Sequence, residues 1–248
     1  MTASVRPVVL SIASWFTRCN SGLMLFYHDI YKGIKYTDMG TSLSVFKEHV
    51  DTIRSKGCRF VPWAPTRIGE VKLCFDDGFR GIWDCRDFFC SEGIRPTVFI
   101  APGLVGKSGY LTWSEIKELC NLGFCFQSHT WSHRPLPEVG ENELRHELLD
   151  SRLEIEERLG ATVTGLCFPR GLFSRRIIDA SIAAGYTELY SSIPGDLNDL
   201  SRIMPQETKA KLYTRHLVQF FSAKEVGCVI RGAMKPFARH YLCQHYSS

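Results

Sequence analysis

The stretch LCFDDGF, Leu73 to Phe79, decides how this sequence is interpreted, because two adjacent carboxylates directly follow an apolar run. The run is typical of a buried strand, and side chains alternate along a strand, so Asp76 and Asp77 cannot face the same way unless the chain turns there. Gly78 permits that turn. One interpretation is a solvated Asp-Asp-Gly turn that ends a strand. The other is a pair of acids with separate chemical tasks.

Other apolar runs of strand length recur along the chain and alternate with segments of helical spacing. Predicted strands lie at 23–27, 71–75, 97–101, 124–127, 164–168 and 187–191, and predicted helices at 44–57, 112–123 and 141–160. This alternation implies a parallel sheet, since parallel neighbours need crossover connections. No internal repeat or linker divides the 248 residues. The sequence therefore predicts one α/β domain, most simply a distorted, incomplete (β/α) barrel with its reactive groups where strands end.

Charge and cysteine content exclude several classes of protein. The net charge of +4 comes from acids and bases interspersed along the chain, so no nucleic-acid partner is predicted. The ten cysteines include no C-x-x-C pair, so no zinc ribbon is predicted. Reduced thiols in a cytoplasmic protein are the favoured interpretation.

The apolar segment VVLSIASWF, Val8 to Phe16, could change the predicted location. It is too short to span a bilayer and lacks a clear cleavage site of small residues. We expect a helix within 1–21 that packs on the domain. Attachment at the inner face of a membrane and a signal peptide are the alternatives.

A second cluster of polar side chains follows the apolar run FCFQ. The segment SHTWSH places His129 and His133 four residues apart, the spacing that puts two imidazoles on one face of a helical turn. Two such histidines and a carboxylate from another strand end suit a catalytic zinc, which uses three protein ligands and leaves one position open. Two surface histidines on a helix are the alternative.

At this point the sequence resembles a known family. FDDG and HTWSH resemble the first two motifs of the polysaccharide deacetylases, which have the NodB-homology fold of carbohydrate esterase family 4. Further segments are similar in the same order and extend the resemblance over about residues 22 to 205. They are LFYH (25–28), CFPRG (167–171) and RIMP (202–205).

The resemblance implies a role for each motif residue. Asp77 is the metal ligand together with His129 and His133, and Asp76 is the base that takes a proton from the attacking water. The backbone N–H of Arg170, the residue after the third-motif proline, stabilises the oxyanion. The implied cofactor is a divalent transition metal, zinc first, with cobalt, nickel and iron as alternatives.

For the general acid and the substrate contacts, the match between this sequence and the family motifs is less direct. No late Leu-x-x-His motif is evident, so we assign the acid to His28, as in circularly permuted members of the family. The arginine that orients the base in many members is replaced by Cys167 or Phe168, which leaves Arg202 as a guess for that partner. We expect Trp131, Pro169 and Arg202 to contact substrate.

The sequence thus predicts a metal-dependent deacetylase that removes an N-acetyl group from a sugar in a polysaccharide or glycan precursor. Hydrolysis of a small amide or a formyl group is the first alternative, and a non-catalytic glycan-binding protein is the second. We expect a helical segment at 1–21, a deacetylase domain at 22–212 and a helical extension at 213–248 packed on that domain.

Overall fold

The fold was analysed in a computed structural model, which describes residues 22–192, 204–205 and 207–230. The predicted helical segment at 1–21 and Arg202 lie outside the described residues, as does the last part of the predicted extension, 231–248. No helix of the described part has the length and apolar character needed to cross a bilayer.

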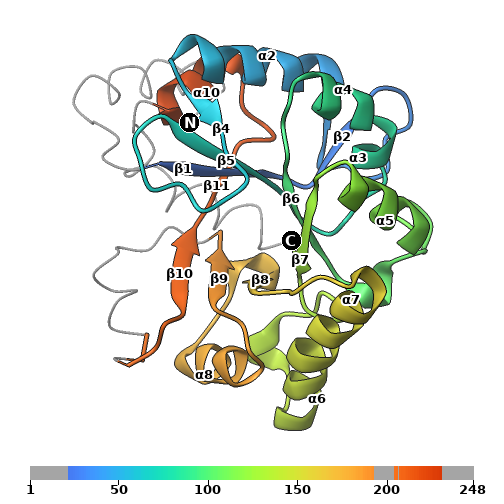
Figure 1. The fold of residues 1–248 in the computed structure, drawn as a ribbon, viewed down its shortest axis with the longest axis vertical. Helices are drawn as coiled ribbons and strands as arrows, with labels where there is room; N and C mark the ends of the chain where they lie inside the picture. The colour runs from blue at the N-terminus through green and yellow to red at the C-terminus, as the bar shows by residue number, and fades with distance from the viewer. Residues whose placement is uncertain (1–21, 193–203, 206, 231–248) are drawn as a thin grey trace.

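A parallel sheet forms the centre of the molecule, with helices around it (Figure 1). All six predicted strands are present, and their ends lie within one or two residues of the predicted ones. Their apolar side chains are buried, on the outer face of the sheet against the helices and on the inner face against one another. The strands of this sheet are β1 (Leu23–Tyr27), β4 (Arg59–Phe60), β5 (Glu70–Phe75), β6 (Thr97–Ile100), β7 (Cys125–Ser128), β8 (Gly165–Cys167), β9 (Glu188–Ser191), β10 (Lys211–Thr214) and β11 (His216–Leu217).

The sheet is nearly closed into a barrel, which confirms the predicted fold class. Its strand order is β10-β9-β8-β7-β6-β5-β1-β11, with β4 beside β5. The two ends of this order, β10 and β11, are separated along the chain only by Arg215. One segment, 211–217, therefore pairs first with β9 and then with β1, where Leu25 lies opposite His216.

The predicted domain boundary at 212 falls inside this segment. A domain ending at 212 would cut β10 in the middle and leave β11 outside the sheet. The sheet includes residues up to 217, because the backbone of 211–217 supplies hydrogen bonds that both sheet edges need. The expected helix of the extension follows as α10 (Ala223–Ile230), which packs on α2 through contact between Gly227 and Thr52.

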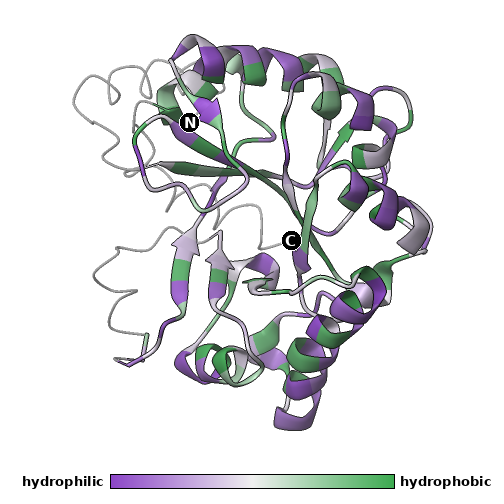
Figure 2. Ribbon diagram, in the orientation of Figure 1, coloured by the Kyte–Doolittle hydropathy of each residue, from purple (hydrophilic) through white to green (hydrophobic). Residues whose placement is uncertain are grey.

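The helices end and begin at signals that are visible in the sequence. Ser42 caps the helix that follows it, Thr112 and Glu115 form a complete capping box, and Gly160 adopts a left-handed conformation after the last turn. Figure 2 shows polar outer faces on these helices and hydrophobic strands between them. The helices are α2 (Leu43–Ser55), α3 (Gly81–Asp84), α4 (Arg86–Ser91), α5 (Trp113–Asn121), α6 (Glu141–Arg145), the π-helix η3 (His146–Asp150), α7 (Ser151–Leu159) and α8 (Arg175–Ala183).

Shorter elements complete the fold. A small parallel sheet and three single turns of 3₁₀-helix connect the larger elements. They are β2 (Asp29–Tyr31), β3 (Gly40–Ser42), η1 (Pro102–Leu104), η2 (Leu136–Glu138) and η4 (Pro169–Gly171).

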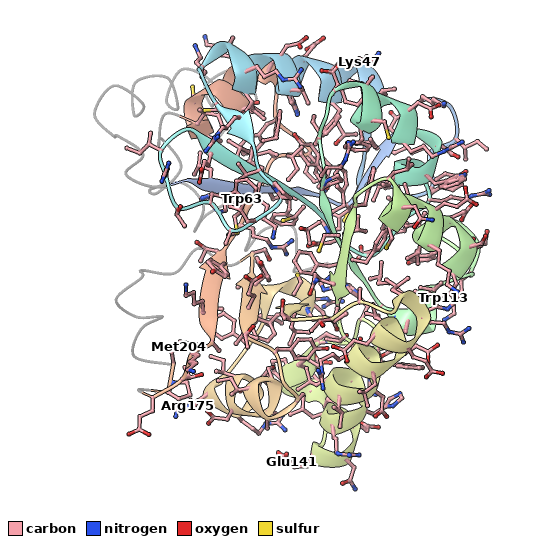
Figure 3. The ribbon with its side chains drawn as sticks, viewed as in Figure 1. Lys47, Trp63, Trp113, Glu141, Arg175 and Met204 are labelled. Carbon is pink, nitrogen blue, oxygen red and sulfur yellow. The ribbon has the colours of Figure 1, made fainter. Side chains whose placement is uncertain are left out.

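Two hydrophobic clusters divide the residues of each strand between them. On β1, Leu25 and Tyr27 pack outward against helices, while Met24 and Phe26 face the interior of the barrel. The interior cluster is small and is completed by Cys74, Phe99, Cys167 and Tyr190. Side chains at the carboxyl ends of the strands lie directly above this cluster, which positions the candidate site. The outer helices instead present charged residues to solvent, such as Lys47, Glu141 and Arg175 (Figure 3).

Candidate active site

The predicted chemical residues converge on one pocket at the carboxyl ends of the strands. His28 follows β1, Asp76 and Asp77 follow β5, and both His129 and His133 follow β7. The pocket has a volume of about 240 Å³. It is lined by these five residues together with Phe26, Met39, Phe168, Arg170 and Ser192.

The Asp-Asp-Gly turn separates the two carboxylates. Asp77 and Gly78 both have positive φ, 69° and 77°, so the chain reverses its side-chain direction between Asp76 and Asp77. A Cβ on Gly78 would lie 2.8 Å from the Ile100 side chain, so the position favours glycine for space as well as conformation. Asp76 and Asp77 are only 4% and 6% exposed. The alternative of a solvated turn is therefore excluded.

Asp77, His129 and His133 form a compact set of three metal-type ligands. Asp77 Oδ1 lies 3.3 Å from Nε2 of His129 and 3.1 Å from Nε2 of His133. Their spacing had predicted a helical turn, but the two histidines do not lie on one. They flank a loop in which Thr130 and His133 have positive φ, and that loop folds both rings back onto Asp77.

The donor chemistry of this set fits a divalent metal. His129 donates from Nδ1 to the backbone carbonyl of Cys167 at 2.8 Å, which leaves the Nε2 lone pair directed at Asp77. Asp77 Oδ1 is buried and accepts no hydrogen bond from any described residue. An orphaned carboxylate oxygen between two imidazole nitrogens is what a three-ligand site for a transition metal presents.

Charge stabilises the ionised form of Asp77. Burial by itself would raise the pKa of this carboxyl, but the contacts with His129 and His133 outweigh it and hold the pKa well below its usual range. The pKa of His133 moves the other way: burial lowers it, and the neighbouring Asp77 raises it above the ordinary value. Asp77 is therefore anionic at neutral pH, as a carboxylate metal ligand must be.

A buried glutamate holds the histidine loop in place. Glu147 accepts hydrogen bonds from the backbone N–H groups of Trp131 and Ser132, both at 2.9 Å, and from the Ser132 hydroxyl. Glu147 lies in the π-helix η3, a local widening of the helix that is frequent near functional sites. The sequence predicted one regular helix over 141–160 and gave no sign of this contact.

Asp76 is held by an arginine that the sequence analysis did not identify. Arg215 donates through Nη1 to Asp76 Oδ1 at 2.5 Å and through Nη2 to Oδ2 at 2.8 Å. Its guanidinium lies between the rings of Phe26 and Phe99, at 4.4 and 5.0 Å from their centroids. Burial would raise the pKa of Asp76, but the Arg215 charge lowers it below the ordinary value. The Asp76 carboxylate is therefore ionised at neutral pH and fixed in orientation.

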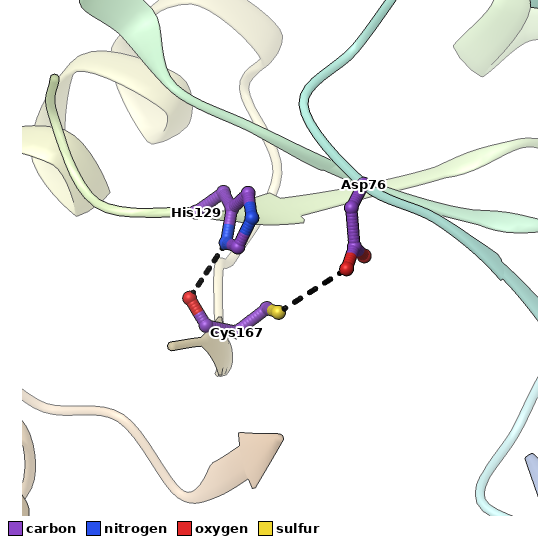
Figure 4. A group of neighbouring side chains, drawn as sticks. All are labelled: Asp76, His129 and Cys167. Atoms are coloured by element: carbon purple, nitrogen blue, oxygen red, sulfur yellow. Dashed lines mark hydrogen bonds between the residues drawn. The ribbon is translucent and has the colours of Figure 1, made fainter. Parts of the chain in front are cut away.

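Cys167 stands where many relatives are expected to carry the orienting arginine. Its thiol donates to Asp76 Oδ2 at 3.8 Å, and its carbonyl accepts from His129 (Figure 4). Asp76, His129 and Cys167 are a second group close enough together to hold a metal ion, but they fit one less well than Asp77, His129 and His133 do. The Asp76 carboxylate is taken by Arg215, the His129 Nδ1 carries a proton, and burial raises the pKa of the Cys167 thiol well above its usual value.

His28 also lines the pocket and is buried, at 8% exposure. Its Nδ1 is 2.7 Å from Oε1 of Gln219, and the same oxygen accepts the His28 backbone N–H at 3.0 Å. Gln219 was not among the predicted site residues, because it lies in the stretch that was predicted to be a helical extension.

The third motif forms a strained turn beside the pocket. Arg170 has φ 57° between Pro169 and Gly171, and its side chain is exposed at the pocket. The N–H groups of Gly171 and Leu172 donate within the turn, whereas that of Arg170 makes no backbone hydrogen bond with any described residue. The predicted oxyanion donor is thus unengaged.

Two predicted substrate contacts lie beside the pocket. Trp131 packs against the His146 ring at 4.8 Å and against Gly103, and Pro169 is buried; neither residue lines the pocket. The backbone at Trp131 is held by Glu147, which accepts from the N–H groups of Trp131 and Ser132. Their role in substrate binding stays a prediction.

Backbone strain is concentrated at this site. Among the described residues, those with positive φ other than glycine are Asp77, Thr130, His133 and Arg170. All four belong to the three motifs around the pocket. Such conformations persist only where the surrounding structure enforces them, and they cluster at functional sites.

Comparison with known proteins identifies the family. Residues 64–189, about half of the chain, match the sequence profile of the polysaccharide deacetylases. The chain belongs to this family. YxkH of Bacillus subtilis, whose name places it among the polysaccharide deacetylases, is 25% identical over 126 residues, which are 50% of this chain and 45% of YxkH. The chain thus aligns with less than half of the length of this relative.

Solved structures of the family share the fold. The Streptococcus pyogenes deacetylase PplD, solved in complex with acetate, superposes with a TM-score of 0.69 at 17% identity, over 83% of this chain and 96% of that one. A polysaccharide deacetylase from Bacillus cereus gives a TM-score of 0.70 at 19% identity, over 85% of this chain and 69% of that one. These similarities establish the barrel.

The family match does not reach every residue of the pocket. His28, Arg215 and Gln219 all lie outside residues 64–189. The sequence did contain a pattern that could have indicated Arg215. KLYT is a short strand-like run, and Arg215 directly follows it, just as Asp76 directly follows the run that forms β5. Circular permutation, inferred from the early position of LFYH, stays a prediction.

Proposed function

We propose that this chain is a metal-dependent hydrolase that removes an N-acetyl group from a sugar in a polysaccharide or glycan precursor. The observation that carries the proposal is the placement of an ionised Asp76, an imidazole at His28 and a three-ligand set around a single pocket. Membership of the polysaccharide deacetylase family supports this reaction. The acetate bound to the Streptococcus pyogenes deacetylase is consistent with acetyl chemistry on this fold.

Asp77, His129 and His133 would hold the metal. The mixed carboxylate and imidazole set suits zinc, and also cobalt, nickel or iron. When bound, such an ion supplies Lewis acidity, which makes water a stronger nucleophile and polarises the acyl oxygen. The side chains around it perform the remaining tasks.

Asp76 accepts the proton of the water that attacks the acetyl carbon. Its two oxygens are held by Arg215, so the carboxylate does not need to reorient during the reaction. The N–H of Arg170 donates to the oxyanion that develops on the acetyl oxygen. His28 then protonates the departing nitrogen, so that acetate and a free amine leave the site.

The exposed Arg170 side chain bears on the class of substrate. It lies at the pocket and forms no ion pair with a carboxylate of the described residues. A free cation there favours a glycan with an acidic or phosphate group near the acetylated sugar. A substrate contact by Arg202, which lies outside the described residues, stays a prediction. The cytoplasmic location stays a prediction from the sequence.

Acetate release is expected from acetylated glycans and nucleotide sugars, and it should stop after chelation and return with zinc or cobalt. The purified protein would be screened in parallel for acetate, formate and ammonia. Formate or ammonia without acetate would favour the small-amide alternative. Full activity after exhaustive chelation, with no metal left by elemental analysis, would contradict metal dependence, and no product on any substrate would favour the glycan-binding alternative.

His28→Ala is expected to lower turnover more on an amide than on an activated ester. An amide nitrogen must be protonated as it leaves, whereas an activated alkoxide departs without a proton. General acid catalysis typically contributes about 100- to 10,000-fold, so the loss on the amide should lie in this range. Turnover of matched acetanilide and aryl acetate substrates measures the difference, and equal losses on both would remove His28 from the role of acid.

A further inference from the structure

We propose that Gln219 is a positioning residue for His28: its amide oxygen fixes the imidazole with the proton on Nδ1 and with Nε2 directed into the pocket. The inference rests on the proposed function in one respect, the role of His28 as the acid. The placement of the proton follows from hydrogen bonds alone.

The hydrogen bonds determine which atoms of the two side chains meet. The backbone N–H of His28 donates to Gln219 Oε1 at 3.0 Å. A backbone nitrogen can only donate, so the Gln219 atom at this place must be the oxygen and not the amide nitrogen. The same oxygen lies 2.7 Å from His28 Nδ1. Because an amide oxygen can only accept, Nδ1 must carry the proton.

This tautomer leaves Nε2 available for the reaction. In a neutral ring with a proton on Nδ1, Nε2 holds the lone pair, and in the charged ring Nε2 holds the transferable proton. Since Nδ1 faces Gln219 and the ring lines the pocket, the proton is exchanged at the edge that faces the reacting atoms. Gln219 keeps its own hydrogen bond through both states.

The segment that carries Gln219 is itself anchored beside β1. The Gln219 carbonyl accepts from the Thr41 hydroxyl at 3.0 Å, and two residues later the Phe221 carbonyl is 2.8 Å from Nε2 of His49. The other ring nitrogen of His49 is 2.9 Å from the hydroxyl of Tyr27, the residue before His28. The anchored segment and the end of β1 are therefore linked through buried side chains.

The same segment also holds the base. Arg215 pairs with Asp76, and Gln219, four residues later, bonds His28. Both groups that transfer protons are thus oriented by residues 215–219. This short stretch lies where the barrel closes, beyond the part of the chain that matches the family profile.

The first test is the position of the proton in the unaltered protein. Long-range ¹H–¹⁵N spectra of the zinc-loaded protein, at a pH where the ring is neutral, distinguish the two tautomers, and the His28 signals are those lost in His28→Ala. We expect a protonated Nδ1. A wild-type His28 protonated on Nε2 would overturn the proposal, whether or not any variant folds and whether or not the protein is a deacetylase.

The second test removes the amide oxygen while keeping the side-chain volume. Gln219→Met is expected to abolish the fixed Nδ1 tautomer and to lower turnover at least about tenfold more on an amide than on an activated ester, as loss of acid positioning should. Gln127→Met is the matched control. Gln127 is another buried glutamine whose Oε1 accepts a backbone N–H, that of Gly165, but it contacts no imidazole.

The outcomes separate the inference from the proposed function. A folded Gln219→Met protein that keeps the Nδ1 tautomer would overturn the inference, as would equal losses on the two substrates when His28→Ala shows unequal ones. Effects of the same size in Gln127→Met would also overturn it, since they would indicate a general loss of packing. If the wild type hydrolysed no acetylated substrate, the proposed function would fail, and the tautomer spectra would still decide the role of Gln219.

Discussion

Asp77→Asn is expected to lose the metal, while Asp76→Asn is expected to keep it and lose turnover. Asparagine replaces an anionic ligand oxygen of the Asp77, His129 and His133 set with a neutral one. At position 76 the same change removes only the proton acceptor. Turnover of Asp76→Asn should fall about 100- to 10,000-fold, the range for a lost general base.

Thermal stability provides a second measurement of the same difference. A metal at 100 times its Kd stabilises the folded state by about 2.7 kcal/mol, and this part of the stability should be absent in Asp77→Asn. Both variants would be purified side by side, and metal content, melting temperature with and without zinc, and turnover would be measured. Metal loss in Asp76→Asn alone would reverse the two roles, and full metal with normal turnover in both would contradict them.

Arg215→Met is expected to destabilise the fold by about 3 to 5 kcal/mol, because it leaves the Asp76 carboxylate buried without its counter-charge. In the wild type the folded-state pKa of Asp76 is lowered, so the ion pair contributes stability above the unfolded pKa near 3.9 and loses it as the pH falls. Without Arg215, burial should raise the folded-state pKa above the unfolded one. Stability of the variant should then fall as the pH rises.

Chemical denaturation of Arg215→Met across pH 5 to 8 measures this effect. Arg175→Met is the matched control, because Arg175 also contacts both oxygens of an aspartate, Asp179, but on the surface of α8 (Figure 3). That exposed pair should contribute about 0 to 1 kcal/mol. Asp76→Asn should restore part of the stability of Arg215→Met. An Arg215→Met protein no less stable than Arg175→Met would contradict the role of the buried pair.

The sequence predicted the strands and the capping of the helices, because these follow from local pattern, and its resemblance to a family pointed to most of the pocket. Apolar runs of strand length gave β1, β5 and β9 almost residue for residue, and Thr112 with Glu115 gave the start of α5. Asp76 and Asp77 were recognised as candidate site residues because two adjacent acids at the end of a buried strand are costly to bury unless they are paired or bind a ligand.

The errors arose where a contact between distant segments overrides local pattern. Spacing predicted a helical turn for His129 and His133, but Glu147 binds the intervening N–H groups and holds an irregular loop. No local pattern indicated that the two sheet edges share one closing segment, 211–217.

By itself the sequence determined the parallel α/β barrel, because hydrophobic periodicity is encoded within short stretches, and its resemblance to a family singled out Asp77, His129 and His133 as candidate metal ligands. Only the tertiary structure decided which residues hold the candidate acid, His28, and the candidate base, Asp76. Arg215 is 139 residues from Asp76, and Gln219 is 191 residues from His28. Their pairing depends on the register that joins β10 to β9 and β11 to β1, and no local pattern specifies which distant strand end a buried side chain will meet.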